Sequence, residues 1–300
     1  MHNAKPIFAF LNDANARGVR TALVTVTEVT GASTRNPGTH MAVAEDGSFA
    51  GSLSGGCIEM AVVAEAQAAI ADGVVRQARF GAGSPYIDIR LPCGGSIDLL
   101  FTPLANGDLA RAAFAQLNAR ESVTFDLARG DGSKFTVKHA PALRIAIIGH
   151  GATVSALHKQ ASAFGAETLV LTPDSTIVEE VRAQADPAIL LKTAAAQPDF
   201  VSDAWTASVF TFHDHDWEGA LIKQALAQPG FFIGCMGSRK THAARCEMLA
   251  ALGVSEHDRD RIVAPIGLIP SSRDPETLAL SILAQVVDRY HALIGTAQPV

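Results

Sequence analysis

Apolar and polar residues follow two different patterns along the chain, and the change falls near residue 142. The first half holds short segments, bounded by turns, that are rich in β-branched residues or alternate between apolar and polar positions. Such segments predict β-strands arranged as a meander or hairpins. They are 20–29, 41–44, 49–53, 87–91 and 97–101, the last two flanking Cys93-Gly94-Gly95 as a hairpin with a glycine-rich tip. An apolar residue also recurs at every fourth position from Ile58 to Ile70, which predicts a helix over 57–72 that ends at Gly73.

The second half alternates short apolar segments with helical ones, a pattern typical of repeated βα units in a parallel, doubly wound sheet. The predicted strands are 145–148, 169–171, 208–212, 231–236 and 262–264. The last helix is marked most clearly, with Asp274 as its N-cap, Pro275 in its first position and an apolar stripe from Leu278 to Val286. We therefore predict a Rossmann-like domain in this half.

Between the two patterns, residues 106–142 contain a weak helix, a charged strand-like stretch and Pro141 just before the new apolar run. Because domains usually have about 100–200 residues, a chain of 300 residues is expected to form one large or two ordinary domains. We predict two: a smaller N-terminal α+β domain over 1–130, and a Rossmann-like, doubly wound parallel-sheet domain over 143–300.

Composition and charge narrow the classes of function. The formal net charge is −6 without a lysine or arginine cluster, which disfavours an extended nucleic-acid surface. No apolar run has the length of a bilayer span, and residues 1–10 lack the apolar core of a secretion signal, so we expect a cytoplasmic protein without membrane contact. The four cysteines are far apart and never spaced C-x-x-C, which argues against a disulfide framework or a zinc finger. Cys235, in an apolar strand, and Cys246, in a helix, are interpreted as structural.

The least ordinary segment is GSLSGGCIE at 51–59, which places Cys57 at a predicted helix N-terminus directly after Gly55 and Gly56. The partial positive charge of a helix N-terminus favours a thiolate, while Glu59 in the first turn opposes it. A small buried cysteine is the alternative interpretation, but the two preceding glycines bare the backbone, so we favour a ligand site. Cys93, at the glycine-rich tip, is also in a position that is typically exposed. Two such thiols on one small domain suggest that the domain handles sulfur or a metal cofactor.

A glycine-rich turn follows the first strand of the predicted Rossmann-like domain. Gly149 and Gly151 stand between that strand and a helix, where backbone N–H groups and the helix dipole can hold a phosphate or pyrophosphate. The match to a dinucleotide-binding motif is partial, because Val154 replaces the third glycine and Asp174 lies 25 residues after Gly149, where about 20 are expected. The alternative interpretation is a turn whose glycines only allow close packing.

Two further segments follow predicted strands of the same domain. His213 and His215, in the run HDHD at 213–216, can ligate a metal or transfer protons; for Asp216 we favour the alternative of a helix cap in solvent. Ser238 and Arg239 open the next helix, where they form either an anion site or an ordinary cap with solvated basic residues. Spacing alone does not decide between these alternatives.

Taken together, these motifs resemble those of the xanthine dehydrogenase accessory protein family, of the XdhC/CoxI type. The segment 51–59 resembles the N-terminal signature of the family, and LPCGG at 91–95 resembles its second. In the C-terminal half the resembling segments come in the expected order: 149–156, 211–216, 232–234, 237–241 and 265–268. The resemblance therefore covers nearly the whole chain.

The resemblance implies a chaperone rather than an enzyme. Members of the family bind the molybdenum cofactor and protect it. Together with a cysteine desulfurase they assist the exchange of an oxo for a sulfido ligand, and they deliver the cofactor to a molybdenum hydroxylase such as xanthine dehydrogenase. Carried over by position, Cys57 and Cys93 would contact the cofactor or its sulfur, with Gly55, Gly56 and Glu59 as their scaffold. The resemblance also implies a homodimer.

The chemistry of helix ends adds a phosphate site to this expectation. The molybdenum cofactor contains a pterin with a phosphate group, and helix N-termini bind phosphates through free N–H groups. We therefore expect Gly149, Gly151, Ser238 and Arg239 to be cofactor-binding residues that hold this phosphate. His213 and His215 remain candidates for a metal.

The Rossmann-like half departs from the family pattern at several places. His150 stands inside the glycine motif rather than after it, Thr172 replaces an acid at the end of the second strand, and IPSS at 269–272 replaces a stretch with an acid and a glycine. These departures weaken the case for NAD(P) binding. An NAD(P)-dependent oxidoreductase that uses 149–153 with His213 or His215 is the competing function, and a docking adaptor with dispensable cysteines is a third.

Overall fold

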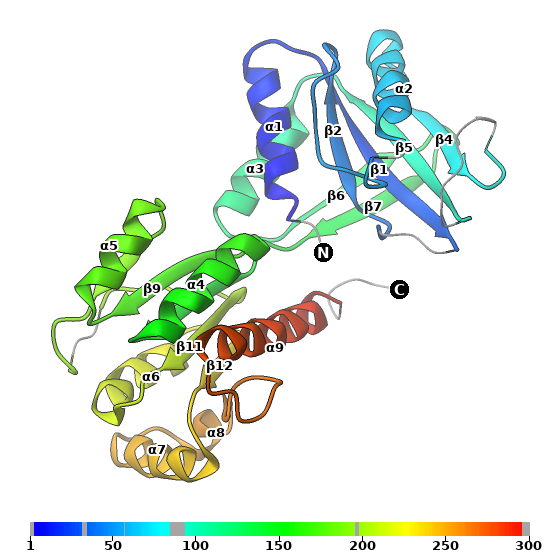
Figure 1. Ribbon diagram of the computed structural model, residues 1–300. Helices are drawn as coiled ribbons and strands as arrows, with labels where there is room; N and C mark the ends of the chain where they lie inside the picture. The colour runs from blue at the N-terminus through cyan, green and yellow to red at the C-terminus, as the bar shows by residue number, and fades with distance from the viewer. Residues whose placement is uncertain (1–2, 32–34, 57, 85–93, 196–197, 296–300) are drawn as a thin grey trace. The chain divides into compact units, whose positions relative to one another are not determined.

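The computed structural model describes residues 3–31, 35–56, 58–84, 94–195 and 198–295 (Figure 1). The chain divides into two compact units, Met1–Pro141 and Ala142–Val300. Each unit has its own main sheet and its own hydrophobic core. Within the described ranges, no helix is long and apolar enough to cross a membrane.

The first unit is built on a five-stranded antiparallel sheet in the order β3-β2-β1-β5-β4. Its strands are β1 (Thr21–Thr30), β2 (His40–Ala44), β3 (Phe49–Ala50), β4 (Arg76–Gly81) and β5 (Ser96–Leu104). Helix α2 (Glu59–Asp72) packs on one face. The other face is covered by α1 (Lys5–Ala16), α3 (Asp108–Asn118) and the hairpin of β6 (Val123–Ala128) and β7 (Lys134–His139). Because both faces are covered, residues 21–26 of β1 are buried at every position rather than at alternate ones.

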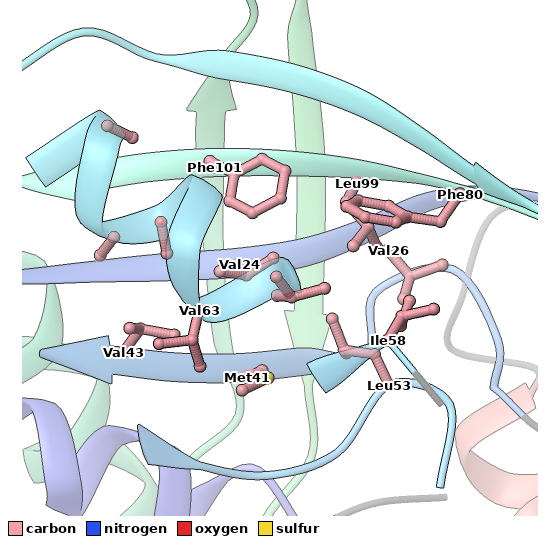
Figure 2. Packing of buried hydrophobic residues seen from close by; sticks show 14 of the residues in the cluster. Val24, Val26, Met41, Val43, Leu53, Ile58, Val63, Phe80, Leu99 and Phe101 are labelled. Carbon is pink, nitrogen blue, oxygen red and sulfur yellow. The ribbon is translucent and has the colours of Figure 1, made fainter. Parts of the chain in front are cut away.

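The face toward α2 forms one apolar cluster (Figure 2). Val26 of β1 and Met41 of β2 belong to it, and so do Leu53 and Ile58 from the segment that precedes α2. Each of these four side chains is at most 1% exposed. The segment between Leu53 and Ile58 is therefore tied to the core at both of its ends.

The pairing of β5 corrects one prediction. Ile97 of β5 lies opposite Val29 of β1 on one side and opposite Phe80 of β4 on the other. Both edges of 96–101 are thus occupied, so the predicted hairpin of 97–101 with 87–91 is wrong for β5; residues 87–91 themselves lie outside the described residues. The apolar pattern did not reveal β4, because Arg76 and Arg79 give this strand the charged character that suits a sheet edge.

The second unit is built on a six-stranded parallel sheet in the order β10-β9-β8-β11-β12-β13. Its strands are β8 (Arg144–Gly149), β9 (Glu167–Thr172), β10 (Ala188–Leu190), β11 (Thr206–Thr211), β12 (Phe232–Cys235) and β13 (Ile262–Val263). Its helices are α4 (Ala152–Phe164), α5 (Ser175–Ala183), the short 3-10 helix η1 (His215–Trp217), α6 (Glu218–Leu226), α7 (Arg239–Ala251), α8 (Glu256–Arg259) and α9 (Pro275–Gly295). The predicted Rossmann-like, doubly wound parallel sheet is confirmed.

Strand order in this sheet reverses between β8 and β11. β8 is followed along one direction by β9 and β10, and along the other by β11, β12 and β13. Helices α4 and α9 lie side by side (Figure 1), and Asp274 caps α9 as predicted, accepting hydrogen bonds from the N–H groups of Glu276 and Thr277. Ligands of doubly wound sheets bind beyond the carboxyl ends of the strands at such a reversal, which directs attention to the residues after β8 and β11.

Candidate functional site

The segment between β3 and α2 folds around the carboxylate of Glu59, which is only 7% exposed. Six donors converge on its two oxygens at 2.6–3.2 Å: the hydroxyls of Ser52 and Ser54, and the N–H groups of Leu53, Ser54, Gly56 and Ile58. The predicted scaffold residues Gly55 and Gly56 have φ values of 82° and 116°, which favour glycine. Both glycines are exposed. We call residues 52–58 with Glu59 the Glu59 loop.

The charge of Glu59 is balanced by the loop itself. Burial alone would raise the pKa of its carboxyl, but the hydrogen bonds from Ser54 and Ser52 outweigh that effect and lower the pKa to about 2. The carboxylate is therefore ionised at neutral pH. Because the N–H groups of Leu53, Ser54, Gly56 and Ile58 serve Glu59, the loop is a rigid support and does not offer these groups to a ligand. Cys57 lies outside the described residues, between two that Glu59 holds.

Described residues that flank the two cysteines in the chain lie at the same end of the sheet. β1 ends where β5 begins, with Thr30 opposite Ser96, and β3 leads into the Glu59 loop beside the start of β2. Arg35, in the connection from β1 to β2, donates from Nε to the carbonyl oxygen of Ser52 at 2.9 Å and so fastens the loop there. Cys93 lies outside the described residues, and its neighbour Gly94 is exposed.

The second unit has a cavity of about 860 Å³ at the carboxyl ends of its central strands. Of the predicted residues, Gly151, Ser238, Arg239 and His213 line it. Gly149 does not line the cavity: a Cβ atom there would overlap Oγ1 of Thr211, so the position is closed to larger residues. Several lining residues were not predicted as site residues from the sequence, because aliphatic and basic residues in a loop carry no recognisable motif: Met236, Ile266, Leu268, Ile269 and Arg273.

The turn from β12 to α7 begins with a helix cap. Oγ of Ser238 accepts a hydrogen bond from the N–H of Thr241 at 3.1 Å, so Ser238 is the N-cap of α7. Arg239 is exposed, and within the described ranges it has no hydrogen-bond or ion-pair partner. The geometry therefore gives Ser238 a structural task and leaves the Arg239 guanidinium available to a ligand.

A buried ion pair supports this turn and was not expected from the sequence. Arg245 donates from Nε and Nη2 to the two carboxylate oxygens of Glu218 at 2.9 and 3.0 Å, and from Nη2 to the carbonyl oxygen of Met236 at 2.8 Å. Both charged side chains are 0% exposed. The pair joins α6, α7 and the end of β12. Because an arginine on a helix is usually solvated, the sequence did not predict that Arg245 is buried.

The HDHD segment at 213–216 places one of its two histidines at the cavity. His213 is exposed at the cavity, whereas the side chain of His215 lies outside the described part of the chain. Among the described side chains, no group of three or more His, Cys, Asp or Glu residues is placed to hold a metal ion, and the metal site stays a prediction. The preferred role of Asp216 as a helix cap is wrong, because η1 intervenes and α6 begins after Trp217 without a side-chain cap.

The remaining cysteines, Cys235 and Cys246, belong to the second unit. Cys235 is fully buried, and burial raises the pKa of its thiol, in keeping with a structural role. Sγ of Cys246, which is partly exposed, lies 3.6 Å from Nε2 of His242.

Asp174, the sequence candidate for a ribose-binding carboxylate, instead accepts hydrogen bonds from the first-turn N–H groups of α5 as its N-cap.

Two features define the class of protein. The first unit is antiparallel and has a loop whose sequence contains a cysteine, and the second is Rossmann-like and has a cavity at its strand reversal. A sequence model described as the XdhC Rossmann domain matches residues 145–286, and one described as the XdhC and CoxI family matches residues 14–81. The chain is also 32% identical over 303 residues to the molybdenum cofactor insertion chaperone PaoD of Escherichia coli K12, covering 96% of this chain and 89% of PaoD. The chain therefore belongs to the XdhC and CoxI family.

The fold is found in a solved structure as well. A crystal structure of a Bacillus halodurans protein described as a xanthine dehydrogenase matches with a TM-score of 0.78 and 22% sequence identity. The match covers 97% of this chain and 98% of that one. At this identity the likeness establishes the fold alone.

Proposed function

We propose that this protein is a chaperone that binds the molybdenum cofactor, protects it and inserts it into a molybdenum enzyme. The similarity to PaoD along 96% of the chain supports the proposal. The observation that carries it is the Glu59 loop, in which six hydrogen bonds to one carboxylate hold the residues on both sides of Cys57. A cysteine on so rigid a support is suited to hold a ligand rather than to fill a core.

The chemistry of the loop agrees with a molybdenum ligand. A thiolate is a soft donor and suits soft metal centres and sulfur. An ionised carboxylate near Cys57 in the sequence would oppose a thiolate. The hydrogen-bond donors of Ser52, Ser54 and the backbone offset the charge of Glu59 and reduce this effect. We propose that Cys57 and Cys93 contact the cofactor or its sulfur, and that Gly55, Gly56 and Glu59 position Cys57.

The proposed partners follow from the family. We propose a molybdenum hydroxylase of the xanthine dehydrogenase type as recipient, a cysteine desulfurase as the source of sulfur for the sulfido ligand, and a homodimer as the working form. Capture of the cofactor-free hydroxylase by the immobilised protein tests the first, and sedimentation equilibrium tests the last. Failure to capture the hydroxylase while cofactor is still bound would limit the role to storage.

Cofactor retention is the first experiment. The purified chain is incubated with free molybdenum cofactor without oxygen and passed through gel filtration, and the pterin is quantified by the fluorescence of its oxidised form. We expect stoichiometric pterin with the unaltered chain and its loss in Cys57→Ala and Cys93→Ala. Cys246→Ala is the matched control, because Cys246 is a partly exposed cysteine of the other unit and should not affect retention. Retention in both Cys57→Ala and Cys93→Ala would contradict the assignment of these thiols.

A further inference from the structure

We propose that the cavity of the second unit binds a phosphate ester of a flat heterocycle, such as a nucleotide or a pterin phosphate. The phosphate would lie between the N-terminus of α4 and Arg239, and the ring would lie against Ile266, Leu268 and Ile269. All lining residues come from the second unit. The site lies in the second unit and the Glu59 loop in the first; a pterin phosphate as ligand rests on the proposed function, whereas a nucleotide as ligand does not.

The phosphate end of the cavity is formed by an open helix N-terminus. Side chains cap α5, α7 and α9, whereas α4 and α6 have no side-chain cap. Gly151, with a φ of 80° that favours glycine, turns the chain into α4, and the next two residues, Ala152 and Thr153, line the cavity. No capping side chain accepts from the N–H groups of Ala152 and Thr153, whereas that of Val154 donates to the carbonyl oxygen of Gly151. Phosphate-binding helices use such first-turn N–H groups.

The base of this turn is closed by a buried threonine that does not line the cavity. Thr211, the last residue of β11, is fully buried, and its Oγ1 has no hydrogen-bond partner among the described residues. The same oxygen occupies the space that a side chain at Gly149 would fill, at the base of the turn that carries Gly151. Gly149 therefore lets β8 and β11 approach closely, and His150 and Gly151, further along the turn, are the residues that line the cavity.

The charged side chains that line the cavity favour an anion. Arg239 and Arg273 line it, and within the described ranges neither has a hydrogen-bond or ion-pair partner. Asp274 is the only carboxylate among the described lining residues, and its oxygens already accept the N–H groups of Glu276 and Thr277. A cavity with two available guanidinium groups is notable on a chain whose net charge is −6.

Part of the cavity lining is aliphatic. Ile266 is buried. Leu268 and Ile269 are 56% and 45% exposed, because they line a cavity rather than a packed core. The volume of about 860 Å³ falls within the range of small-molecule sites, roughly 300–1,000 Å³. A lining that combines two arginines with aliphatic side chains fits a phosphate joined to a flat ring. NAD is not favoured, because Asp174 caps α5 and is not among the lining residues.

Calorimetric titration of the full chain tests the proposal. Adenosine monophosphate and 6-hydroxymethylpterin phosphate are the two phosphate probes, and adenosine and 6-hydroxymethylpterin are their unphosphorylated controls. We expect one or both phosphate esters to bind, and removal of the phosphate to weaken binding roughly 10- to 100-fold, as expected for charge-assisted hydrogen bonds. The probe that binds more tightly identifies the source of the ring. Absence of binding by both phosphate esters would overturn the proposal.

Two neighbouring basic residues give a matched pair of variants. Arg239→Glu reverses a charge at the cavity, and Lys240→Glu makes the same change at the next residue of α7, which is exposed and does not line the cavity. We expect Arg239→Glu to weaken the phosphate probe at least about tenfold and Lys240→Glu to leave it within about twofold. Equal losses in both variants would show attraction by net charge alone and would overturn the site. Cys57→Ala should bind the probe normally, so failure of the thiol assignment is separable from failure of this site.

Discussion

At the scale of single residues, Glu59 contributes most to the shape of the candidate site. Its carboxylate is the common acceptor for donors from the other residues of the Glu59 loop, and the apolar side chains of Leu53 and Ile58 enter the core on either side. The family motif predicts Glu59 as part of a scaffold for Cys57, and this role stays a prediction. The convergence of six donors was not predictable, because it depends on the two glycines adopting positive φ values together.

Replacing this carboxylate by an amide should be costly. In Glu59→Gln, one acceptor oxygen becomes an NH₂ group that faces N–H or O–H donors, so several of them lose their partner. We expect a loss of roughly 2–4 kcal/mol in the free energy of unfolding of the first unit, together with weaker cofactor retention. Urea denaturation followed by far-UV circular dichroism measures the first effect, and pterin content measures the second.

The control for this variant lies on the same helix. Glu65 forms an ion pair with Arg76 at 3.0 Å on a partly exposed surface. Glu65→Gln is therefore expected to cost only about 0–1 kcal/mol and to keep the cofactor. If both variants were destabilised equally, the Glu59 carboxylate would have no special place in the loop.

At the scale of elements, the Glu218–Arg245 pair joins two helices and a turn in the second unit. Glu218 begins α6, Arg245 lies in the middle of α7, and the same guanidinium holds the carbonyl oxygen of Met236 beside the cavity. Both side chains are fully buried, and the two helices also contribute Leu221, Ile222 and Leu249 to the apolar core cluster of the second unit. A charge left alone in such surroundings is strongly unfavourable, because it loses its hydration without gaining a partner.

Removing one partner should therefore cost more than removing both. We expect Arg245→Met to destabilise the second unit by about 3–5 kcal/mol, because it leaves the Glu218 carboxylate buried without its guanidinium. The double variant Arg245→Met with Glu218→Leu should recover at least half of this loss. Denaturation followed by tryptophan fluorescence measures both, since Trp217 adjoins Glu218. A double variant as unstable as the sum of the single ones would show that the two residues act independently.

The elements also show how far sequence patterns reach. The strands of the Rossmann-like sheet were predicted because they are buried on both faces and read as short apolar runs, as β8 does. Helix α1 was overlooked, although Ile7, Leu11 and Ala14 have helical spacing and are buried. β10 has only three residues and offers no period to detect. The cavity was located by its glycine turn, but its aliphatic wall comes from the loop before α9, which only the tertiary fold brings to the strand ends.

At the scale of the whole molecule, acid should weaken the first unit through a buried pair of histidines. Nε2 of His40 lies 2.8 Å from Nε2 of His139, and Nδ1 of His40 lies 2.9 Å from Oγ1 of Thr25. The rings of Phe8 and Phe125 pack around the two imidazoles. The pair links β2 to the β6–β7 hairpin through groups that must stay largely uncharged.

Burial sets the protonation of both histidines. It lowers the pKa of His40 well below its usual value, with His139 adding to the effect, and it lowers the pKa of His139 from 6.5 to about 4. Between pH 6.5 and 4 the unfolded chain therefore binds more protons than the folded one, and stability falls as the pH falls. For His139 alone the loss amounts to roughly 3 kcal/mol by pH 4. The carboxylate of Glu59, with its pKa of about 2, adds a further loss below pH 4.5.

The slope of stability against pH is the measurement that isolates the histidine pair. Each of the two histidines should contribute up to about 1.4 kcal/mol per pH unit between pH 6 and 4, so His139→Gln should remove about half of the slope of the first unit. His257→Gln, at an exposed position, should leave it unchanged. Both tryptophans, Trp205 and Trp217, belong to the second unit, so their fluorescence reports that unit while circular dichroism follows both. A slope in His139→Gln equal to that of the unaltered chain would mean that the acid sensitivity comes from carboxylates alone.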